Sequence, residues 1–92
     1  MAKLKTSEIK NALLKLPDWK RTGLAISRTF EFKDFVAAIR FVNAVARLAE
    51  KALHHPDIDI RWSKVTLALT THSEGGLTKQ DFALANQFNA LV

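Results

Sequence analysis

Apolar and polar side chains alternate with two different periods along this chain, and the changes of period mark the expected elements. From Asp34 to about Leu53 there is no glycine or proline, and apolar residues recur every three or four positions, as in an amphipathic helix. Pro56 follows directly, and helices rarely continue up to a proline. The pattern therefore predicts one long helix, whose apolar face comprises Phe35, Ile39, Val42, Val45, Ala46 and Ala49.

Two further segments show the two-residue period of half-buried strands. Residues 19–22 and 24–30 flank Gly23 and predict a hairpin with Leu24, Ile26, Arg28 and Phe30 on one face. Later, apolar side chains occupy even positions from Ile58 to Trp62 and odd positions from Val65 onward. Because one regular strand cannot change parity, we expect a turn or bulge at Ser63–Lys64 and a strand on each side of it.

The residue patterns at both ends of the chain predict short helices. Ser7 is a plausible N-cap for a first helix that ends before Pro17. Its expected apolar stripe comprises Ile9, Leu13, Leu14 and Leu16. Thr78 and Asp81 have nearly the spacing and chemistry of a capping box and open a last helix. The apolar positions of this last helix are Phe82, Ala85, Phe88 and Leu91.

The predicted order is helix, two strands, helix, two strands, helix. Paired hairpins separated by helices indicate an α+β fold, a four-stranded antiparallel sheet with three helices packed on one face. Residues 1–92 are enough for a single domain, and no linker or repeat divides them.

Charge and composition narrow the classes of partner. Residues 1–22 hold six basic and two acidic side chains, which leaves +4 of the net charge of +5 there. Because these charges are dispersed, we interpret them as a solvated face and expect no nucleic-acid partner. No apolar run approaches the ~18 residues of a membrane span, and no apolar region follows the N-terminal lysines as in a signal peptide. With no cysteine present, we expect a cytoplasmic protein that does not bind membranes.

All three histidines lie within residues 54–72, and they are the candidate chemistry. His54 and His55 follow the long helix, and His72 follows the last strand. Imidazole has an ordinary pKa of ~6.5 and exchanges protons near neutral pH without a metal. Glu50, four residues before His54, is expected to orient that ring. The alternative is that these are surface histidines without a role.

Other candidate roles are weighed in the same way. Three histidines can bind zinc, but adjacent residues seldom both ligate one ion, and His-Glu-x-x-His and cysteine pairs are absent, so we expect no metal. For Asp81, the role of a helix cap is expected in preference to that of a catalytic acid. For Trp19 and Trp62, a place in the core or an interface is expected in preference to a role as a platform for a ligand.

These residues together resemble the signature of the pterin-4a-carbinolamine dehydratases. The resemblance covers nearly the whole chain, and three histidines with a proline, an aromatic residue and an acid at fixed spacings make it specific. The matching run is Glu50-x3-His54-His55-Pro56-x5-Trp62-x9-His72-x8-Asp81, with Trp19 and Phe32-Lys33-Asp34-Phe35 as N-terminal features. Trp62 stands where the family often has tyrosine, and Ile58 where some members have tryptophan.

The resemblance implies a hydro-lyase of the same α+β fold that forms homodimers or homotetramers. It would dehydrate 4a-hydroxytetrahydrobiopterin to quinonoid dihydropterin and water, and so recycle the pterin used by an aromatic amino acid hydroxylase. The pterin is the substrate, and no metal or cofactor is implied. Catalysis would fall to His54, His55 and His72, and substrate binding to Glu50, Pro56, Trp19 and Asp81.

Two other functions remain open on the sequence alone. Some family members also stabilise dimers of a homeodomain transcription factor, and here an interaction module would use a helix surface and not the histidines. Alternatively, the fold serves a different small molecule, or none.

Overall fold

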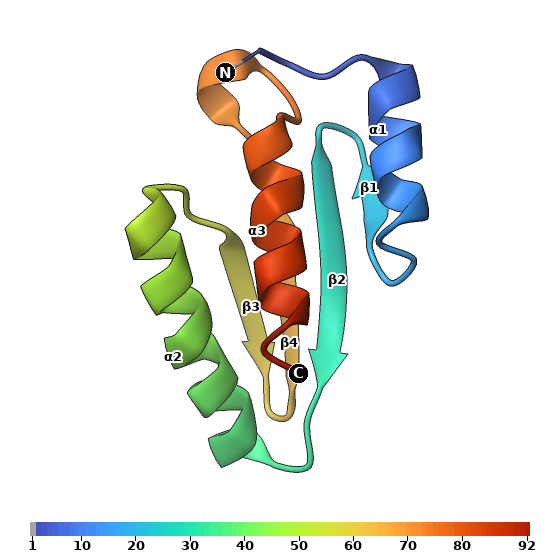
Figure 1. The fold of residues 1–92 in the computed structure, drawn as a ribbon. Helices are drawn as coiled ribbons and strands as arrows, with labels where there is room; N and C mark the ends of the chain where they lie inside the picture. Colours follow the sequence, from blue (N-terminus) through green and yellow to red (C-terminus); the bar gives the residue numbers. More distant parts are fainter. Residues whose placement is uncertain (1) are drawn as a thin grey trace.

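The computed structural model of the protein describes residues 2–92 (Figure 1). Its elements follow the order predicted from the hydrophobic pattern. In chain order they are α1 (Thr6–Leu14), β1 (Lys20–Thr22), β2 (Ala25–Glu31), α2 (Phe35–Ala52), β3 (Asp57–Arg61), β4 (Lys64–Leu69), the 3-10 turn η1 (His72–Glu74) and α3 (Lys79–Asn89).

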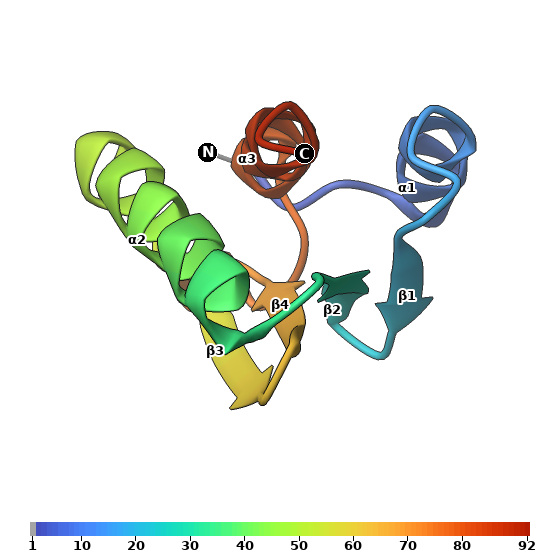
Figure 2. The same cartoon turned by 90° about the horizontal axis from the view of Figure 1, so that it is seen from below.

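The four strands form one antiparallel sheet in the order β1-β2-β4-β3. All three helices lie on the same face of this sheet, as Figure 2 shows from below. In the central pair, Ile26 is opposite Leu69 and Phe30 is opposite Val65, so the even positions of β2 and the odd positions of β4 face the helices together. The α+β architecture expected from the sequence is confirmed.

The core lies between the sheet and the three helices. Phe30 is packed against Phe41 of α2 at 4.6 Å between ring centroids and meets the edge of Trp19 at 6.2 Å. Trp19 is therefore a core residue. Trp62 is instead 72% exposed in the β3–β4 turn. That turn falls at Trp62–Ser63, one residue earlier than predicted, because Lys64 already pairs with Arg61.

Helix α2 begins and ends close to the predicted positions, but its buried face is rotated. The Asp34 carboxylate caps the helix by accepting a hydrogen bond from the Ala37 amide at 2.8 Å. The buried residues are Ala38, Phe41, Val45 and Ala49. Phe35, which was expected on the core face, is 50% exposed. Helix α2 covers the β3 side of the sheet (Figure 2), and its four buried residues form one narrow stripe along the helix.

The two terminal helices differ in how well their caps were predicted. Helix α1 begins one residue before Ser7, and its N-cap is Lys5, whose amide donates to the Glu8 carboxylate at 2.9 Å. Leu14 is 75% exposed because it lies off the face formed by Ile9 and Leu13. Helix α3, by contrast, begins with the expected capping box.

In α3 the expected apolar positions Phe82, Ala85 and Phe88 are buried, whereas Leu91 follows the helix and is 39% exposed. No helix within residues 2–92 combines the length and the hydropathy that a membrane span requires.

Candidate active site

The candidate residues gather at the end of the molecule where α2 ends, β3 begins and α3 starts (Figure 1). The amide of the Gln80 side chain donates to the Ala52 carbonyl at 3.1 Å, so the start of α3 is tied directly to the end of α2. This contact brings residues far apart in the sequence to one place. The histidines at positions 54 and 55 follow α2 immediately, and His72 begins η1.

Asp81 is the buried centre of this region. Its side chain has 0% exposure and lies in the first turn of α3. One carboxylate oxygen, Oδ2, accepts hydrogen bonds from the Thr71 hydroxyl at 2.8 Å and from the Thr78 amide at 2.9 Å. The Thr78 and Thr71 hydroxyls are themselves 2.9 Å apart. Because the Thr71 hydrogen is given to Asp81, the Thr78 hydroxyl donates to Thr71.

The second oxygen of Asp81 holds a histidine. Oδ1 lies 2.5 Å from Nε2 of His54, whose side chain is only 12% exposed. A carboxylate only accepts hydrogen bonds, so Nε2 of His54 donates and Nδ1 is the ring nitrogen left for proton exchange. Asp81 was predicted to be a helix cap, and it is one, but the same side chain also fixes a histidine.

Glu50 pairs with a different histidine from the one predicted. Its Oε2 lies 2.5 Å from Nε2 of His55, and both side chains are well exposed. The prediction that Glu50 orients His54 is wrong because α2 ends at Ala52 and Leu53 takes a left-handed backbone with φ 52°. Residue 54 thus leaves the helix face, and the turn places the next side chain beside Glu50.

His72 belongs to a small exposed loop on the same side. The Thr71 amide donates to the Gly76 carbonyl at 3.0 Å, which closes the loop. His72 lines a hollow of about 310 Å³ together with Leu24, Ala25, Thr70, Gly75 and Gly76. None of the five hollows considered for residues 2–92 is lined by His54 or His55. His72 thus lines this hollow without His54 or His55, although all three histidines lie at the same end of the fold.

The remaining predicted residues are divided between this region and the core. Pro56 is half-buried between His55 and the start of β3. Trp19 is not brought to the histidines. It is buried against Phe30, and its indole Nε1 donates to Asn89 Oδ1 at 2.8 Å, near the C-terminal end of α3.

Thr71 is a site residue to which sequence reasoning assigned no role, and Thr78 was predicted only as a helix cap. Thr71 continues the odd, core-facing positions of β4 after Leu69, where apolar side chains are the rule. A polar residue at such a position needs a buried partner, and that was the available signal. Here the partner is Asp81.

The arrangement supports proton transfer by imidazole. Two histidines each have one ring nitrogen held by a carboxylate, which fixes the ring and leaves the other nitrogen to give or accept a proton. Within residues 2–92, no group of three or more histidine, aspartate or glutamate side chains is arranged to hold a metal ion.

Comparison with known proteins identifies the family of this chain. The model of the pterin 4 alpha carbinolamine dehydratase family matches residues 2–91. A protein of Acidobacterium capsulatum, provisionally named as a pterin-4-alpha-carbinolamine dehydratase, is 54% identical over 92 residues and covers 100% of both chains.

Solved structures give the same result. The crystal structure of a transcriptional coactivator/pterin dehydratase from Brucella melitensis has a TM-score of 0.93 and 40% identity, over 97% of each chain. A pterin dehydratase-like protein described as a RuBisCO assembly factor of the alpha-carboxysome has a TM-score of 0.67 at 23% identity, over 79% of this chain and 84% of that one, and shares the fold. The chain therefore belongs to the pterin-4-alpha-carbinolamine dehydratase family.

Proposed function

We propose that the protein is a hydro-lyase that converts 4a-hydroxytetrahydrobiopterin to quinonoid dihydropterin and water. The observation that carries the proposal is the hydrogen bond between buried Asp81 and His54, which leaves one imidazole nitrogen fixed for proton transfer. Family membership supports the same reaction class. The pterin is the substrate, and the proposed chemistry uses no metal and no cofactor.

The proposed reaction divides two proton transfers among three histidines. The 4a-hydroxyl takes a proton from His54 or His72, and the carbon–oxygen bond breaks as water leaves. The electron pair of the ring nitrogen forms the new carbon–nitrogen double bond, and that nitrogen releases its proton. His55 holds the pterin edge and accepts the ring proton, with Glu50 stabilising the imidazolium that results.

The other residues predicted to bind substrate differ in their position relative to the histidines. Glu50 and Pro56 lie beside the histidines and are proposed to shape the binding surface, whereas Asp81 is 0% exposed and is proposed to act by holding His54. Trp19 is proposed to act at most through core packing, since its side chain is 4% exposed. His72 lines its hollow without His54 or His55, and we propose that a second copy supplies a further wall of the site.

We propose a homodimer or homotetramer for this reason. Strand β3 is an edge strand whose Ile58 and Ile60 are 38% and 39% exposed, with unpaired backbone groups along one side. Antiparallel pairing of two copies about Asp59 sets Asp57 of each opposite Arg61 of the other. Light scattering after gel filtration measures the oligomeric state. A protein that is a monomer both with and without the Ile60→Lys substitution would contradict the proposal.

The cellular setting is part of the same proposal. We expect the protein to work in the cytoplasm, where an aromatic amino acid hydroxylase supplies the carbinolamine. We expect neither a membrane nor a nucleic acid as its partner.

A second candidate function is that of an interaction module. It is favoured by the name of the Brucella protein, which pairs a coactivator role with the dehydratase role. Such a module would bind a partner protein through a helix surface. Partner binding that survives replacement of all three histidines, together with no dehydratase activity in the native protein, would support it.

The test of the proposed enzyme is the decay of enzymatically generated carbinolamine, followed with His54→Ala, His55→Ala and His72→Ala. General acid–base groups contribute roughly 10²–10⁴-fold, so we expect a loss of at least tenfold in kcat/KM for each variant. Asn11→Ala, an exposed position on α1, is the control. Wild-type rates in all three histidine variants would contradict the proposal.

A further inference from the structure

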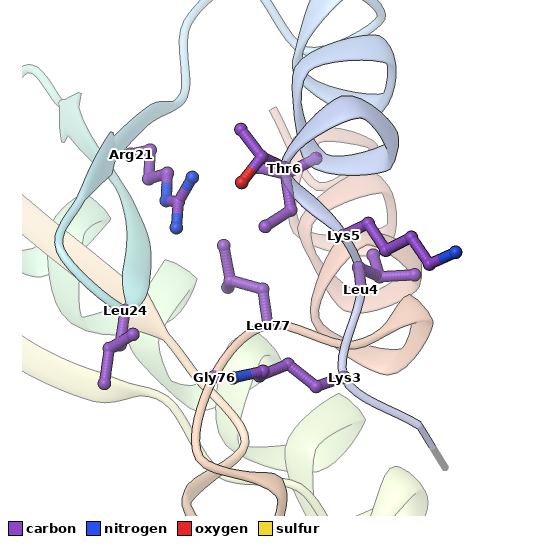
Figure 3. Close-up of a pocket in the computed structure, with 9 residues that line it drawn as sticks. Lys3, Leu4, Lys5, Thr6, Arg21, Leu24, Gly76 and Leu77 are labelled. Carbon is purple, nitrogen blue, oxygen red and sulfur yellow. The ribbon is translucent and has the colours of Figure 1, made fainter.

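A hollow of about 400 Å³ lies beside the His72 loop (Figure 3). Its walls come from the N-terminal segment with the first turn of α1, from the β1–β2 hairpin and from the end of the His72 loop. Its volume is within the range of small-molecule sites. The lining residues are Lys3, Leu4, Lys5, Thr6, Ile9, Arg21, Leu24, Gly76 and Leu77.

The lining holds cations and no carboxylate. In Figure 3, Arg21 reaches in from β1 toward the Thr6 hydroxyl, and Lys3 lies across Gly76, whereas the Lys5 ammonium points away. Within residues 2–92, neither Lys3 nor Arg21 makes an ion pair. Glu8 lies nearby, but it lines the neighbouring hollow with Lys3 and its carboxylate accepts the Lys5 amide. No carboxylate among the lining residues therefore neutralises the positive charge of this cavity.

Both cations are held in place by the backbone. Nε of Arg21 donates to the Gly23 carbonyl at 2.9 Å, which leaves the two terminal nitrogens of the guanidinium for a ligand. The Lys3 side chain is packed so closely on Gly76 that a Cβ there would lie 2.8 Å from Lys3 Cδ. The Leu4 amide donates to the Leu77 carbonyl at 2.8 Å and fixes the segment that carries Lys3. The cavity is therefore built, with apolar walls and two positioned charges.

This basic cavity adjoins the hollow that His72 lines. Leu24 and Gly76 belong to the walls of both. A ligand whose ring contacts His72 can therefore extend a side chain past these two residues into the basic cavity. Arginine recognises phosphate and carboxylate through paired charge-assisted hydrogen bonds, which suits an acidic group at the end of that side chain.

We propose that the Lys3–Arg21 cavity binds an anionic group, a phosphate or a carboxylate, on the side chain of the pterin substrate. This inference rests on the proposed dehydratase function and names its substrate class: pterins with an acidic side chain are turned over in preference to those with a neutral one. The apolar walls contact the carbon chain that joins ring and anion.

The test compares kcat/KM for three carbinolamines: one with a neutral dihydroxypropyl side chain, one with the same side chain as a monophosphate, and one bearing a glutamate carboxylate. We expect the wild type to favour at least one anionic substrate by about tenfold, the effect of one charge-assisted hydrogen bond. The favoured substrate tells phosphate from carboxylate. Equal kcat/KM for all three would overturn the proposal.

The variants locate the effect. Arg21→Gln and Lys3→Gln are expected to lower the ratio of anionic to neutral kcat/KM at least fivefold. Lys20→Gln removes the same charge from the opposite face of β1 and is expected to leave the ratio unchanged. A ratio that falls equally in Lys20→Gln would mean bulk charge and not this cavity, and would overturn the proposal. Thermal unfolding of each variant checks that the fold is intact.

Direct binding separates this proposal from the enzyme activity. If no carbinolamine is dehydrated, the proposed function fails. Calorimetry with the phosphorylated pterin, with the glutamate-bearing pterin and with inorganic pyrophosphate then decides the anion site by itself. Binding that weakens at least fivefold in Arg21→Gln supports the site. No binding of any of the three probes, or tight binding only of a single-stranded oligonucleotide, overturns it.

Discussion

The site contains the same chemical pair twice, in two different environments. The His54–Asp81 pair is buried, with the carboxylate at 0% exposure and two further donors on it, whereas the side chains of the His55–Glu50 pair are 60% and 75% exposed. Both Nε2–oxygen distances are 2.5 Å, so distance alone does not rank them. Water screens the exposed pair, and both of its side chains are free to move elsewhere. The His54 and Asp81 side chains have no such freedom to move because they are buried, so this pair determines the geometry of the site.

Breaking the buried pair is expected to have the largest effect. Asp81→Asn offers an amide NH₂ where a carboxylate oxygen now accepts, so either His54 or the Thr71 and Thr78 donors lose their partner. Removing one partner of a buried pair costs about 3–5 kcal/mol of unfolding free energy. We expect a loss of this order in urea unfolding and at least a hundredfold loss in kcat/KM.

Thr71→Val is the matched control for this experiment. It keeps the Asp81–His54 bond and removes one donor to the carboxylate, and a buried hydrogen bond lost in this way costs about 1–3 kcal/mol. If Thr71→Val were as damaging to kcat/KM as Asp81→Asn, the direct Asp81–His54 bond would not be the decisive contact.

Leu53 separates the two pairs, and replacing it is expected to have a moderate effect of opposite sign. Leu53 has a φ of 52°, a conformation that costs an L-residue roughly 1–2 kcal/mol and glycine little, and its side chain is 79% exposed. Leu53→Gly is therefore expected to stabilise the protein by about 0.5–1 kcal/mol, measured by thermal unfolding.

Lys51→Gly is the control for this change. It introduces the same residue inside the last turn of α2, where glycine is about 1 kcal/mol less favourable than a good helix former. A destabilised Leu53→Gly variant would show that the exposed leucine side chain makes an unrecognised contribution.

Breaking the exposed pair is expected to have the smallest effect on stability. Glu50→Gln removes a solvent-screened charge, and exposed pairs contribute about 0–1 kcal/mol. We expect unfolding free energy to change by less than about 0.5 kcal/mol and kcat/KM to fall no more than about threefold. A loss that matches that of Asp81→Asn would show that the exposed pair matters as much as the buried one, against the expected ranking.

Much of this fold follows from local patterns in the sequence. The change of parity between Trp62 and Val65 predicts two strands where one apolar run is present, and Thr78 with Asp81 predicts the start of α3. These predictions succeeded because each depends on residues close together in the chain. The three histidines were likewise expected at element ends, and they lie there.

The partners of the histidines were harder to predict because they depend on one backbone angle. A helix that ran to residue 54 would have set Glu50 beside His54. Leucine gives no sign that it will take a left-handed conformation. The sequence therefore did not predict that the backbone would turn away from the helix face at Leu53. The rotated face of α2 has a similar origin, since which apolar stripe is buried depends on how the helix crosses the sheet.

Asp81 caps α3 and holds His54 with the same carboxylate. The cap and the hydrogen bond to His54 are therefore lost together when this end of the helix opens. When the first turn of α3 frays, the His54 imidazole is released in the same event, and the molecule is for that moment without a fixed His54. Exchange of amide hydrogens at the start of α3 with deuterated solvent would therefore report how often this happens. Any change elsewhere that loosens this helix end lowers the fraction of competent molecules without touching a histidine.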